Sequence, residues 1–459
     1  MFLIVIGTRP EIIKAMPVIN KMNTKNIPYK LIWSGQHKDY EMSKVFYDEL
    51  NIPKPDVYLN IGDSEDIADK LGYMILEIKK ILDHEKPEAL YGVGDTTTTL
   101  ATALIAGYSN IPFIHDESGM RSFDLTMLEE INRILVDRLA YIHFAPTKLA
   151  VLNLLSEGVP STSIKLVGST AVDSLLQILN SSKIKQAEES IHALINLNKR
   201  TELATLTLHR RENLSCDKLS KLISILDLVG RSFPDLKIVF PVHPHTNKRL
   251  QECGFLNQLT NLPNVIILRP LGYIKFIALI KASSLVITDS GGIQEEAFIL
   301  GKKIITLRKI TEWPETIILG YNKLIDLNER NAIPKIIYEI NVALNEKMKP
   351  PELKNFPIGD GKASERIIRV LKEFESPKIK YNLSSDSFDI PYIISKISIN
   401  QKNLCEFCLN LDNGIPRIIL REKGKNFICI EKSLTDLRDI KGIDLYVNWD
   451  LIDNLNNNR

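Results

Sequence analysis

Residues 287–297 read Ile287-Thr288-Asp289-Ser290-Gly291-Gly292-Ile293-Gln294-Glu295-Glu296-Ala297, an apolar strand that breaks at two glycines and restarts as a helix. Glycines have no Cβ and let the backbone approach a phosphate closely, while the first turn of the new helix offers free N–H groups. Ser290 adds a hydroxyl, and Glu296, about one and a half helical turns further on, can accept hydrogen bonds from a ribose. The pattern predicts a phosphate-binding turn, and a plain tight turn is the alternative interpretation.

The composition describes an ordinary globular chain with more than one domain. Its 459 residues exceed what one hydrophobic core usually serves, and 44% of them are apolar. The formal net charge is only +2, from 58 basic and 56 acidic residues, so neither nucleic acid nor an anionic membrane is indicated as a partner. Any ligand must be sought in local sites.

Hydrophobic segments and cysteines favour a cytoplasmic protein. Residues 1–7 are apolar but lack a basic leader and a cleavage site, so we expect a buried strand rather than a signal peptide. No uninterrupted apolar run reaches the about 18 residues of a membrane-spanning helix. The five cysteines are too few and too scattered for a disulfide scaffold, and the Cys405–Cys408 pair has no second pair to complete a metal site.

Short apolar strands alternate with amphipathic helices, and the rhythm begins again after residue 168. Strands are expected at residues 2–6, 29–33, 89–93, 112–115, 142–145, 203–208, 237–241, 265–268, 285–288 and 303–307. The clearest helices are expected at residues 11–22, 66–83 and 97–107. This alternation predicts two α/β domains, each with a parallel sheet covered on both faces, and a ligand site in the cleft between them.

The composition changes after about residue 375. A polar stretch with proline and several serines begins at residue 376 and reads as a linker, and β-prone pieces follow at 391–399, 418–421 and 427–430. The Asn-rich end is expected to fray. We interpret residues 376–459 as a small appended module whose role the sequence does not declare.

Charged residues cluster where the strands of the first domain are expected to end, which is where open parallel sheets bind ligands. Arg9 lies in the first strand-to-helix turn and can fork onto a phosphate, and Lys14 adds a point charge. Asp95 follows another strand, just before four threonines. The alternatives are a solvated pair at a helix start for Arg9 and Lys14, and a capping acid for Asp95.

Denser groups of acids and histidines follow. Glu117 ends one strand, and Glu129 and Arg133 lie four apart on the next helix, where they share a face and could form an ordinary surface ion pair. In the second domain His209 ends a strand beside two arginines, and His243 ends another. Lone histidines are usually structural, but two at matching strand ends suit proton transfer or phosphate contact.

Seven motifs occur in order along residues 1–371. They are Gly7-Thr8-Arg9-Pro10-Glu11, Gly35-Gln36-His37, Gly94-Asp95-Thr96, Glu129-Glu130-Ile131-Asn132-Arg133, His209-Arg210-Arg211-Glu212-Asn213, Asp289-Ser290-Gly291-Gly292-Ile293-Gln294-Glu295-Glu296 and Thr311-Glu312-Trp313-Pro314-Glu315. Each is moderately specific, and together they resemble the non-hydrolysing UDP-N-acetylglucosamine 2-epimerases. The resemblance leaves the tail uncovered.

The resemblance implies two Rossmann-like domains in the GT-B arrangement, residues 1–167 and 168–360, with a helix near 361–374 crossing back to the first domain. It also implies a UDP-sugar substrate, a homodimer, and no metal or other cofactor. The implied reaction is reversible inversion at C2, which gives UDP-N-acetylmannosamine. The C2 proton is removed as UDP leaves C1, and UDP then adds back to the 2-acetamidoglucal.

The family's functional residues are carried over onto matching positions. The acid/base candidates are Asp95, Glu117 and Glu129, with His209 beside them, and which carboxylate is the base stays open. The implied substrate-binding residues are Arg9, Lys14, Arg133, Arg210, Leu271, Phe276, Ser290, Gly291, Gly292, Glu296 and Arg308. The glycine turn would hold the diphosphate, Glu296 the ribose, and the segment from Leu271 to Phe276 the uracil, with plain helix core as the alternative for Phe276. An activator site of some bacterial members would use Gln36, Arg210 and His243.

Three positions depart from the family pattern. Trp313 stands where many members have an arginine on the diphosphate, a contact that Arg308 could replace. Pro244-His245-Thr246 replaces the usual run after the histidine and weakens the case for an activator site, and Ser169 replaces a common asparagine. A related subfamily that tolerates tryptophan acts on UDP-2,3-diacetamido-glucuronate, which is the second candidate substrate.

Two other function classes share parts of the pattern. A GT-B glycosyltransferase has a similar nucleotide-holding turn, but it would require an acceptor and no paired acids at Glu117 and Glu129. A UDP-sugar sensor without catalysis would leave the acids and His209 with no shared task.

Overall fold

The computed structural model describes residues 1–35, 53–62, 64, 66–195, 201–346, 348–355 and 358–375, and in addition the backbone of five strands nearer the C-terminus. Residues 1–147 and 166–376 form one compact unit, and residues 148–165 with 377–459 form another. Every helix in the described part of the chain is too short or too polar to span a lipid bilayer.

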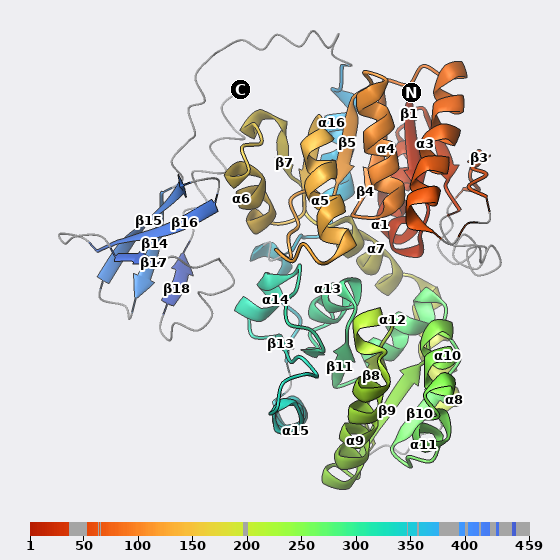
Figure 1. Cartoon of the computed structure of the whole chain (residues 1–459), viewed down its shortest axis with the longest axis vertical. Helices are drawn as coiled ribbons and strands as arrows, with labels where there is room; N and C mark the ends of the chain where they lie inside the picture. The colour runs from red at the N-terminus through yellow and green to blue at the C-terminus, as the bar shows by residue number, and fades with distance from the viewer. Residues whose placement is uncertain are drawn as a thin grey trace. The chain divides into compact units, whose positions relative to one another are not determined.

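The first sheet has seven strands in the order β3-β2-β1-β4-β5-β6-β7 (Figure 1). They are β1 Phe2–Ile6, β2 Tyr29–Trp33, β3 Val57–Tyr58, β4 Ala89–Val93, β5 Phe113–Asp116, β6 Ile142–Ala145 and β7 Ile164–Leu166. Neighbours from β3 to β6 run parallel. The central strands β1 and β4 are buried throughout, which explains why they read as continuous apolar runs without alternation.

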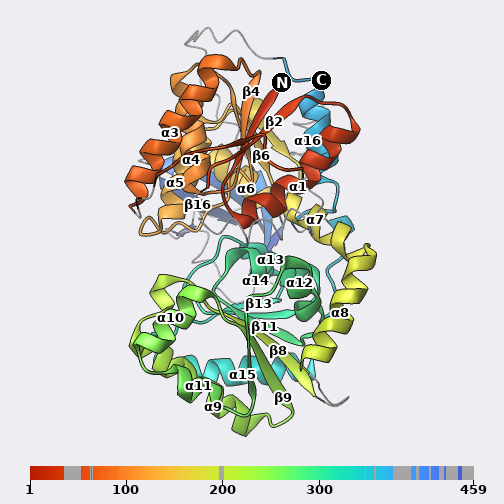
Figure 2. The ribbon, with the colours of Figure 1, turned by 90° about the vertical axis from the view of Figure 1, so that its right-hand side faces the viewer.

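Helices cover both faces of this sheet. The helices of the first sheet are α1 Arg9–Thr24, α3 Ile67–His84, α4 Thr97–Tyr108 and α5 Leu128–Leu139. In Figure 2, α3, α4 and α5 lie together on one face, whereas α1 lies on the other with α7 (Thr170–Leu179) and α16 (Ala363–Lys372). The turn between β1 and α1 requires Gly7, because a Cβ there would lie 1.9 Å from the Ser34 hydroxyl oxygen.

The second sheet has six parallel strands in the order β10-β9-β8-β11-β12-β13. They are β8 Glu202–Thr207, β9 Leu236–Pro241, β10 Val265–Leu268, β11 Leu285–Thr288, β12 Lys303–Thr306 and β13 Asn322–Leu324. The order reverses next to β8, and the glycine turn after β11 lies beside this switch point, where open α/β sheets bind ligands.

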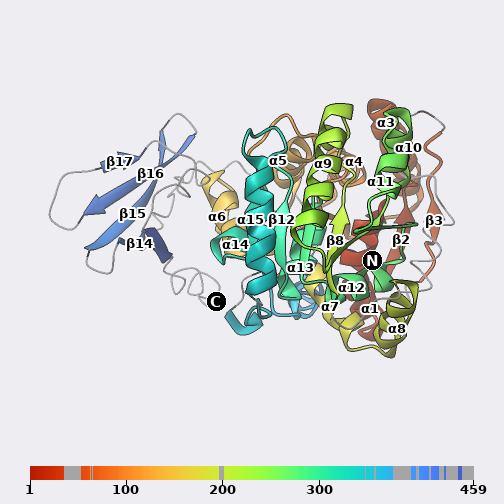
Figure 3. The same cartoon turned by 90° about the horizontal axis from the view of Figure 1, so that it is seen from below.

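The helices of the second half are α8 Ser182–Ile195, α9 Cys216–Ser232, α10 Pro244–Glu252, α11 Leu256–Thr260, α12 Tyr273–Ala282, α13 Gly291–Ile299, α14 Pro314–Ile318 and α15 Ala332–Asn345. Figure 3 shows α9 and α12 on opposite sides of the sheet. The buried faces of α9 and α15 share one hydrophobic cluster with the strands, and α12 packs against α8. The alternation of strands and helices therefore confirms the predicted α/β architecture.

The chain returns to the first sheet through α16, which packs against α1 and α7. Asp173 of α7 holds the N-terminus of α16, since its carboxylate accepts from the backbone N–H groups of Ala363 at 3.0 Å and Ser364 at 2.8 Å. The resemblance implied a crossing helix near 361–374, and α16 occupies residues 363–372. The division of the chain at residues 167 and 360 stays a prediction.

The C-terminal region contains an antiparallel sheet of five strands in the order β17-β16-β15-β14-β18. The strands are β14 Ile394–Ile399, β15 Asn403–Asp412, β16 Ile415–Glu422, β17 Ile428–Ile430 and β18 Ile443–Tyr446. The β-prone pieces expected there overlap β14, β16 and β17, whereas the Asn-rich end lies outside the described residues. Within the same compact unit, residues 148–165 contribute α6, Lys148–Ser156.

Two features differ from the sequence-based expectation. The strands β3, β7, β13, β15 and β18 were not among the predicted ranges, and the first three have only two or three residues, which carry too little periodicity to register. Cys216, at the start of α9, forms a disulfide with Cys253, at the end of α10. The scattered cysteine spacing gave no sign of this pairing, since the two residues lie 37 apart in the sequence.

Candidate active site

The predicted site residues gather at the carboxyl ends of strands from both sheets. In the first sheet these are the turns after β1, β4 and β5, and in the second the turns after β8, β9, β11 and β12. Ion pairs link side chains of the two halves, as described below. The strand ends therefore supply one continuous cluster of charged groups.

Glu11 organises the two turns after β1 and β4, and sequence reasoning did not select it. Its buried carboxylate accepts from the backbone N–H groups of Gly7 at 2.9 Å and Thr8 at 2.7 Å. It also accepts from the hydroxyls of Thr96 at 2.6 Å and Thr99 at 3.1 Å. Burial raises the pKa of Glu11 despite these donors. The Thr-x-x-Glu spacing is a capping box and could have revealed the role.

Asp95 faces an arginine and does not cap a helix. Its carboxylate pairs with the Arg133 guanidinium, and its carbonyl accepts from the Asn132 amide at 2.8 Å. Thr96 caps α4 instead, because its hydroxyl accepts from the Thr99 N–H. Asp95 keeps its side chain 29% exposed, which leaves it accessible to a ligand.

Glu117 stands in a strained turn just after β5. Its φ of 69° lies in the left-handed region, which a residue with a Cβ rarely adopts. Its own N–H donates to the Asp116 carboxylate at 2.9 Å, and its carboxylate pairs with Lys14 of α1. A Cβ at Gly94 would lie 3.0 Å from a carboxylate oxygen of Glu117. Strain of this kind is typical of functional positions, because the surrounding structure has to enforce it.

A fully buried ion cluster supports this turn from behind. The His115 ring nitrogens face the Asp137 carboxylate at 2.6 Å and the Gly94 carbonyl at 2.9 Å. Since both partners are acceptors, the ring carries two N–H groups and is cationic. Burial alone would lower the pKa of His115, but Asp137 raises it. Asp137 also pairs with Arg121 at 2.7 Å, so one carboxylate anchors two cations.

The two adjacent glutamates of α5 have different environments. Glu130 is buried and accepts from the Arg133 guanidinium at 2.8 Å, from both the N–H and the hydroxyl of Ser122 at 2.9 Å, and from the Phe123 N–H at 2.9 Å. Glu129 has a 44% exposed side chain and lies 3.9 Å from the Arg210 guanidinium. The alternative interpretation, an ordinary surface ion pair between Glu129 and Arg133, is therefore excluded. Arg133 points inward, where Glu130 and Asp95 hold it.

Asp289, the last acid before the glycine turn, positions His209 and Arg210. Its buried carboxylate accepts from the backbone N–H groups of His209 at 3.1 Å and Arg210 at 2.9 Å, and lies 3.2 Å from the His209 ring. Burial would raise the pKa of Asp289, but the hydrogen bond from His209 and the electrostatic interaction with His209 hold that pKa below its usual value. His209 keeps a 42% exposed side chain. The exposed ring is thus oriented by a fixed carboxylate.

The residues implied for an activator site are only partly brought together. The ring centroids of His209 and His243 lie 6.2 Å apart, so the two predicted histidines are neighbours. A ring nitrogen of His243 accepts from the His245 N–H at 3.2 Å and caps α10. Gln36, the third implied residue beside Arg210, lies outside the described residues.

The glycine turn forms the N-terminus of α13. Ser290, Gly291 and Gly292 start the helix, and a Cβ at Gly292 would meet no atom within 4 Å, so the turn opens onto free space. Gln294 fastens it from below, because its amide donates to the Ser290 carbonyl at 3.1 Å and accepts from the Thr311 hydroxyl at 2.6 Å. Free N–H groups at a helix start suit an anion.

Two buried carboxyls follow in α13. Burial raises the pKa of Glu296 to about 7 and that of Glu295 to about 8. Lys14 acts on both electrostatically and moderates the shift. Neither oxygen of Glu295 finds a hydrogen-bond partner among the described residues. Both groups therefore take up protons readily near neutral pH.

Glu312 joins three arginines, and sequence reasoning quoted it only as part of a motif. Its carboxylate forms a bidentate pair with Arg308, at 2.8 and 2.9 Å, and lies 3.3 Å from Arg133 and 3.8 Å from Arg210. Burial would raise the pKa of Glu312, but Arg133 and Arg308 hold it well below its usual range. Trp313, next in the chain, is a buried apolar side chain, 3% exposed.

The remaining predicted contacts lie at the edge of this cluster. Arg9 begins α1 and is half-buried. Leu271 lies just before α12, and Phe276 lies on it. Both are also half-buried, so Phe276 is not plain helix core. Lys14 has a side chain that is only 17% exposed, which excludes the solvated-pair alternative for it.

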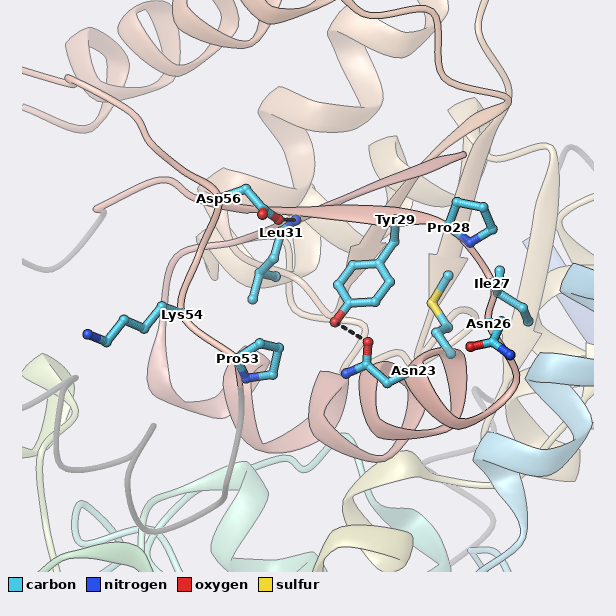
Figure 4. Close-up of a pocket in the computed structure, with 10 residues that line it drawn as sticks. Asn23, Asn26, Ile27, Pro28, Tyr29, Leu31, Pro53, Lys54 and Asp56 are labelled. Carbon is cyan, nitrogen blue, oxygen red and sulfur yellow. Dashed lines mark hydrogen bonds between the residues drawn. The ribbon is translucent and has the colours of Figure 1, made fainter.

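A cavity of about 410 Å³ lies elsewhere, at the amino ends of β2 and β3 (Figure 4). Its lining includes Asn23, Tyr29, Lys54 and Asp56. Tyr29 donates to Asn23 at 2.9 Å, and Asp56 accepts from the Leu31 N–H at 2.7 Å, so these polar groups already satisfy one another. The cavity contains none of the predicted site residues.

Comparisons with known proteins identify the family of this chain. The family model for UDP-N-acetylglucosamine 2-epimerase matches residues 20–372. The UDP-N-acetylglucosamine 2-epimerase of Methanocaldococcus jannaschii is 42% identical over 371 residues, which cover 80% of this chain and 98% of that protein. The enzyme of the same name from Methanococcus maripaludis is 40% identical over 370 residues, 80% of this chain and 97% of that protein.

Solved structures of similar proteins have the same fold. The M. jannaschii UDP-GlcNAc 2-epimerase in complex with UDP-GlcNAc and UDP aligns with a TM-score of 0.72 at 39% identity, covering 82% of this chain and 100% of that one. The Neisseria meningitidis enzyme bound to UDP-GlcNAc aligns with a TM-score of 0.75 at 33% identity, covering 81% of this chain and 100% of that one. The predicted GT-B arrangement is confirmed, and the chain belongs to the UDP-N-acetylglucosamine 2-epimerase family.

Proposed function

We propose that this protein interconverts UDP-N-acetylglucosamine and UDP-N-acetylmannosamine by elimination and re-addition of UDP. The observation that carries the proposal is the chain of ion pairs from Asp95 through Arg133 and Glu312 to Arg308 and Arg210. It joins the acids of the first sheet to the cations beside the glycine turn of the second. Proton removal and departure of an anionic leaving group can thus occur at one place.

In the proposed reaction, a carboxylate takes the proton from C2 of the sugar. The electron pair of the C2–H bond forms the C1=C2 double bond, and the electron pair of the C1–O bond leaves with the diphosphate of UDP. In the return step a diphosphate oxygen attacks C1, and an acid delivers a proton to the other face of C2. Since nothing is oxidised or reduced overall, the reaction needs no redox cofactor.

Proton transfer on two faces requires more than one group, which we assign to Asp95, Glu117 and Glu129, with His209 nearby. Glu117 is the strongest candidate for direct proton transfer, because a strained turn holds it opposite a lysine. A C2 proton with no adjacent carbonyl is weakly acidic, so the developing charge on the leaving diphosphate must be stabilised.

The nucleotide contacts are proposed as follows. The proposed contacts of the diphosphate are Ser290, Gly291, Gly292, Arg133, Arg210 and Arg308, with Arg9 and Lys14 on the first-sheet side. Glu296 would accept from the ribose hydroxyls, and Leu271 and Phe276 would flank the uracil. The N–H groups that start α13 and the three arginines support this assignment, because both favour an anion.

The test uses the purified protein with UDP-N-acetylglucosamine in deuterated water, followed by NMR. We expect UDP-N-acetylmannosamine with deuterium at C2. Release of free N-acetylmannosamine and UDP would show a hydrolysing enzyme instead, and unchanged substrate would refute the proposed activity. The same assay tests the activator site: a hyperbolic rate curve in UDP-N-acetylglucosamine would exclude a role for Gln36, Arg210 and His243 as an activator site.

We further propose a cytoplasmic homodimer. Leu128, Ile131, Leu135 and Leu139 of α5 are 37–44% exposed, and their spacing places them on one helix face. A second copy of this chain could cover that apolar stripe. We expect Leu135→Asp to convert a dimer to a monomer in light scattering, whereas a monomeric wild-type protein would refute the dimer. Cell fractionation tests the compartment.

A further inference from the structure

The three arginines beside the glycine turn already have an anion among them. Arg308, Arg210 and Arg133 come from three different segments, and all three approach the Glu312 carboxylate within 3.8 Å. The Glu312 side chain is 5% exposed. The site that the proposed function gives to a diphosphate is thus lined by cations that a side-chain carboxylate partly neutralises.

The carboxylate also lies beside the helix start. A Cβ on Gly291 would lie 3.4 Å from one Glu312 oxygen, so the carboxylate approaches the first residue of α13. A helix N-terminus stabilises an anion within the first turn. Because Arg133 and Arg308 hold its pKa low against the effect of burial, Glu312 carries its negative charge throughout the working range. It shares the arginines and the helix start with the expected diphosphate.

The three arginines differ in how far they depend on Glu312. Arg133 also pairs with Asp95 and Glu130, and Arg210 lies 3.9 Å from Glu129. The Arg308 side chain is 1% exposed. Among the described residues, Glu312 is the carboxylate that lies within ion-pair distance of it. A change at Glu312 therefore affects the charge balance of Arg308 most.

We propose that Glu312 is an internal counter-anion of the leaving-group site. It neutralises and orients the arginines when UDP is absent and competes with the diphosphate for them when UDP is bound. Glu312 is thus a positioning residue that limits how tightly UDP is held. This inference rests on the proposed function, since it assigns the same arginines to UDP.

A limited grip has a purpose in this reaction. The bond between UDP and C1 breaks and re-forms, so UDP must stay in place when the sugar is detached and still leave as part of the product. Without a carboxylate beside them, the arginines would bind the diphosphate too strongly and slow release of the product. The Glu312 carboxylate lowers this excess affinity and leaves the arginines available for directional hydrogen bonds to the diphosphate.

The experiment measures UDP binding to the full-length protein by calorimetry for wild type, Glu312→Gln, Glu312→Asp and Glu315→Gln. Glu312→Gln keeps the size but removes the charge, so we expect UDP to bind about tenfold more tightly. Glu312→Asp keeps the charge and is expected to stay within about threefold of wild type. Glu315 is also buried but has no cation within ion-pair distance in the described part of the chain, so its variant should bind as wild type does.

Steady-state kinetics separate this role from a purely structural one. The inference predicts that Glu312→Gln lowers both KM and kcat, because substrate and product are both held more tightly. Loss of arginine orientation alone would raise KM. Unchanged or weaker UDP binding by a folded Glu312→Gln variant would overturn the inference while leaving the proposed function intact. If wild type itself binds no UDP, the proposed function fails as well.

A second comparison covers the case in which Glu312→Gln does not fold. Arg308→Gln and the double variant Arg308→Gln/Glu312→Gln remove the buried pair one partner at a time, and the double variant leaves no unpaired Arg308 charge. In the Arg308→Gln background, loss of Glu312 should still tighten UDP binding, because Arg133 and Arg210 are also released. Equal affinity of the two variants would overturn the inference.

Discussion

Glu129 and Glu130 are adjacent in α5 and identical in chemistry, yet the structure places them in opposite environments. Glu130 is buried and accepts four hydrogen bonds, two of them from backbone N–H groups. Glu129 is 44% exposed and faces one distant arginine. The difference teaches that carboxylates at these strand ends divide into two sets, one that holds the turns in place and one that is free to meet a ligand.

The same division runs through the first sheet. Glu11 and Asp137 belong with Glu130, since each accepts from several donors and fixes a turn. Asp95 and Glu117 belong with Glu129, because their carboxylates meet a side-chain cation and no backbone N–H in the described structure. The first set should control stability and the second should control turnover.

The largest expected effect comes from the second set of carboxylates, Asp95, Glu117 and Glu129. Glu117→Gln removes the carboxylate that we propose for proton transfer but keeps its size, so turnover should fall by about 1,000-fold or more. The left-handed turn and the Asp116 contact use the backbone of residue 117 and remain available. The melting temperature should therefore fall only because the largely buried Lys14 loses its carboxylate partner, and it should fall less than in Glu130→Gln. Deuterium exchange at C2 measures the first quantity and thermal unfolding the second; full activity in the variant would remove Glu117 from the mechanism.

The pair Glu129→Gln and Glu130→Gln tests the division directly. Glu130→Gln places an amide NH₂ against donors in a buried site and weakens the partner of Arg133, so we expect a loss of about 3 kcal/mol in the free energy of unfolding. It should also release Phe123, which has a left-handed φ of 60° and donates to Glu130. Glu129→Gln should lower turnover and leave unfolding unchanged. Equal effects of the two variants on both measurements would mean that the two sets do not exist.

The sequence predicted most of the fold, but it identified only one of the two sets of carboxylates. Continuous apolar runs such as 2–6 and 89–93 were placed at the observed bounds, because a strand buried on both faces has a strong signal. The expected strand ends and the family resemblance selected Asp95, Glu117 and Glu129 at one sheet edge. They could not show that Arg133 turns inward to Glu130, since positions three and four residues away are equally near on a helix.

Contacts between distant segments set the remaining limit. Glu312 meets Arg133 across 179 residues of sequence, and Cys216 meets Cys253 across 37. Neither partner carries a local signal of the other, because such pairs arise only when the two sheets and their helices have packed. The family resemblance supplied the arginines of the site, whereas the carboxylate among them required the tertiary structure.

Glu295 belongs to neither set and offers the smallest and most specific effect. Its buried carboxyl finds no hydrogen-bond partner in the described structure, and burial raises its pKa from 4.5 to about 8. Between these two values the folded state binds more protons than the unfolded state, so this group costs stability as pH rises toward 8 and adds no further loss above it. Glu295→Gln removes the titration. We expect the variant to gain on the order of 2 kcal/mol over wild type between pH 5 and pH 8. Thermal unfolding at both pH values measures the gain. A constant difference for Glu295→Gln would show that the carboxyl is ionised in the folded protein, and that Lys14 then neutralises it as it does Glu117.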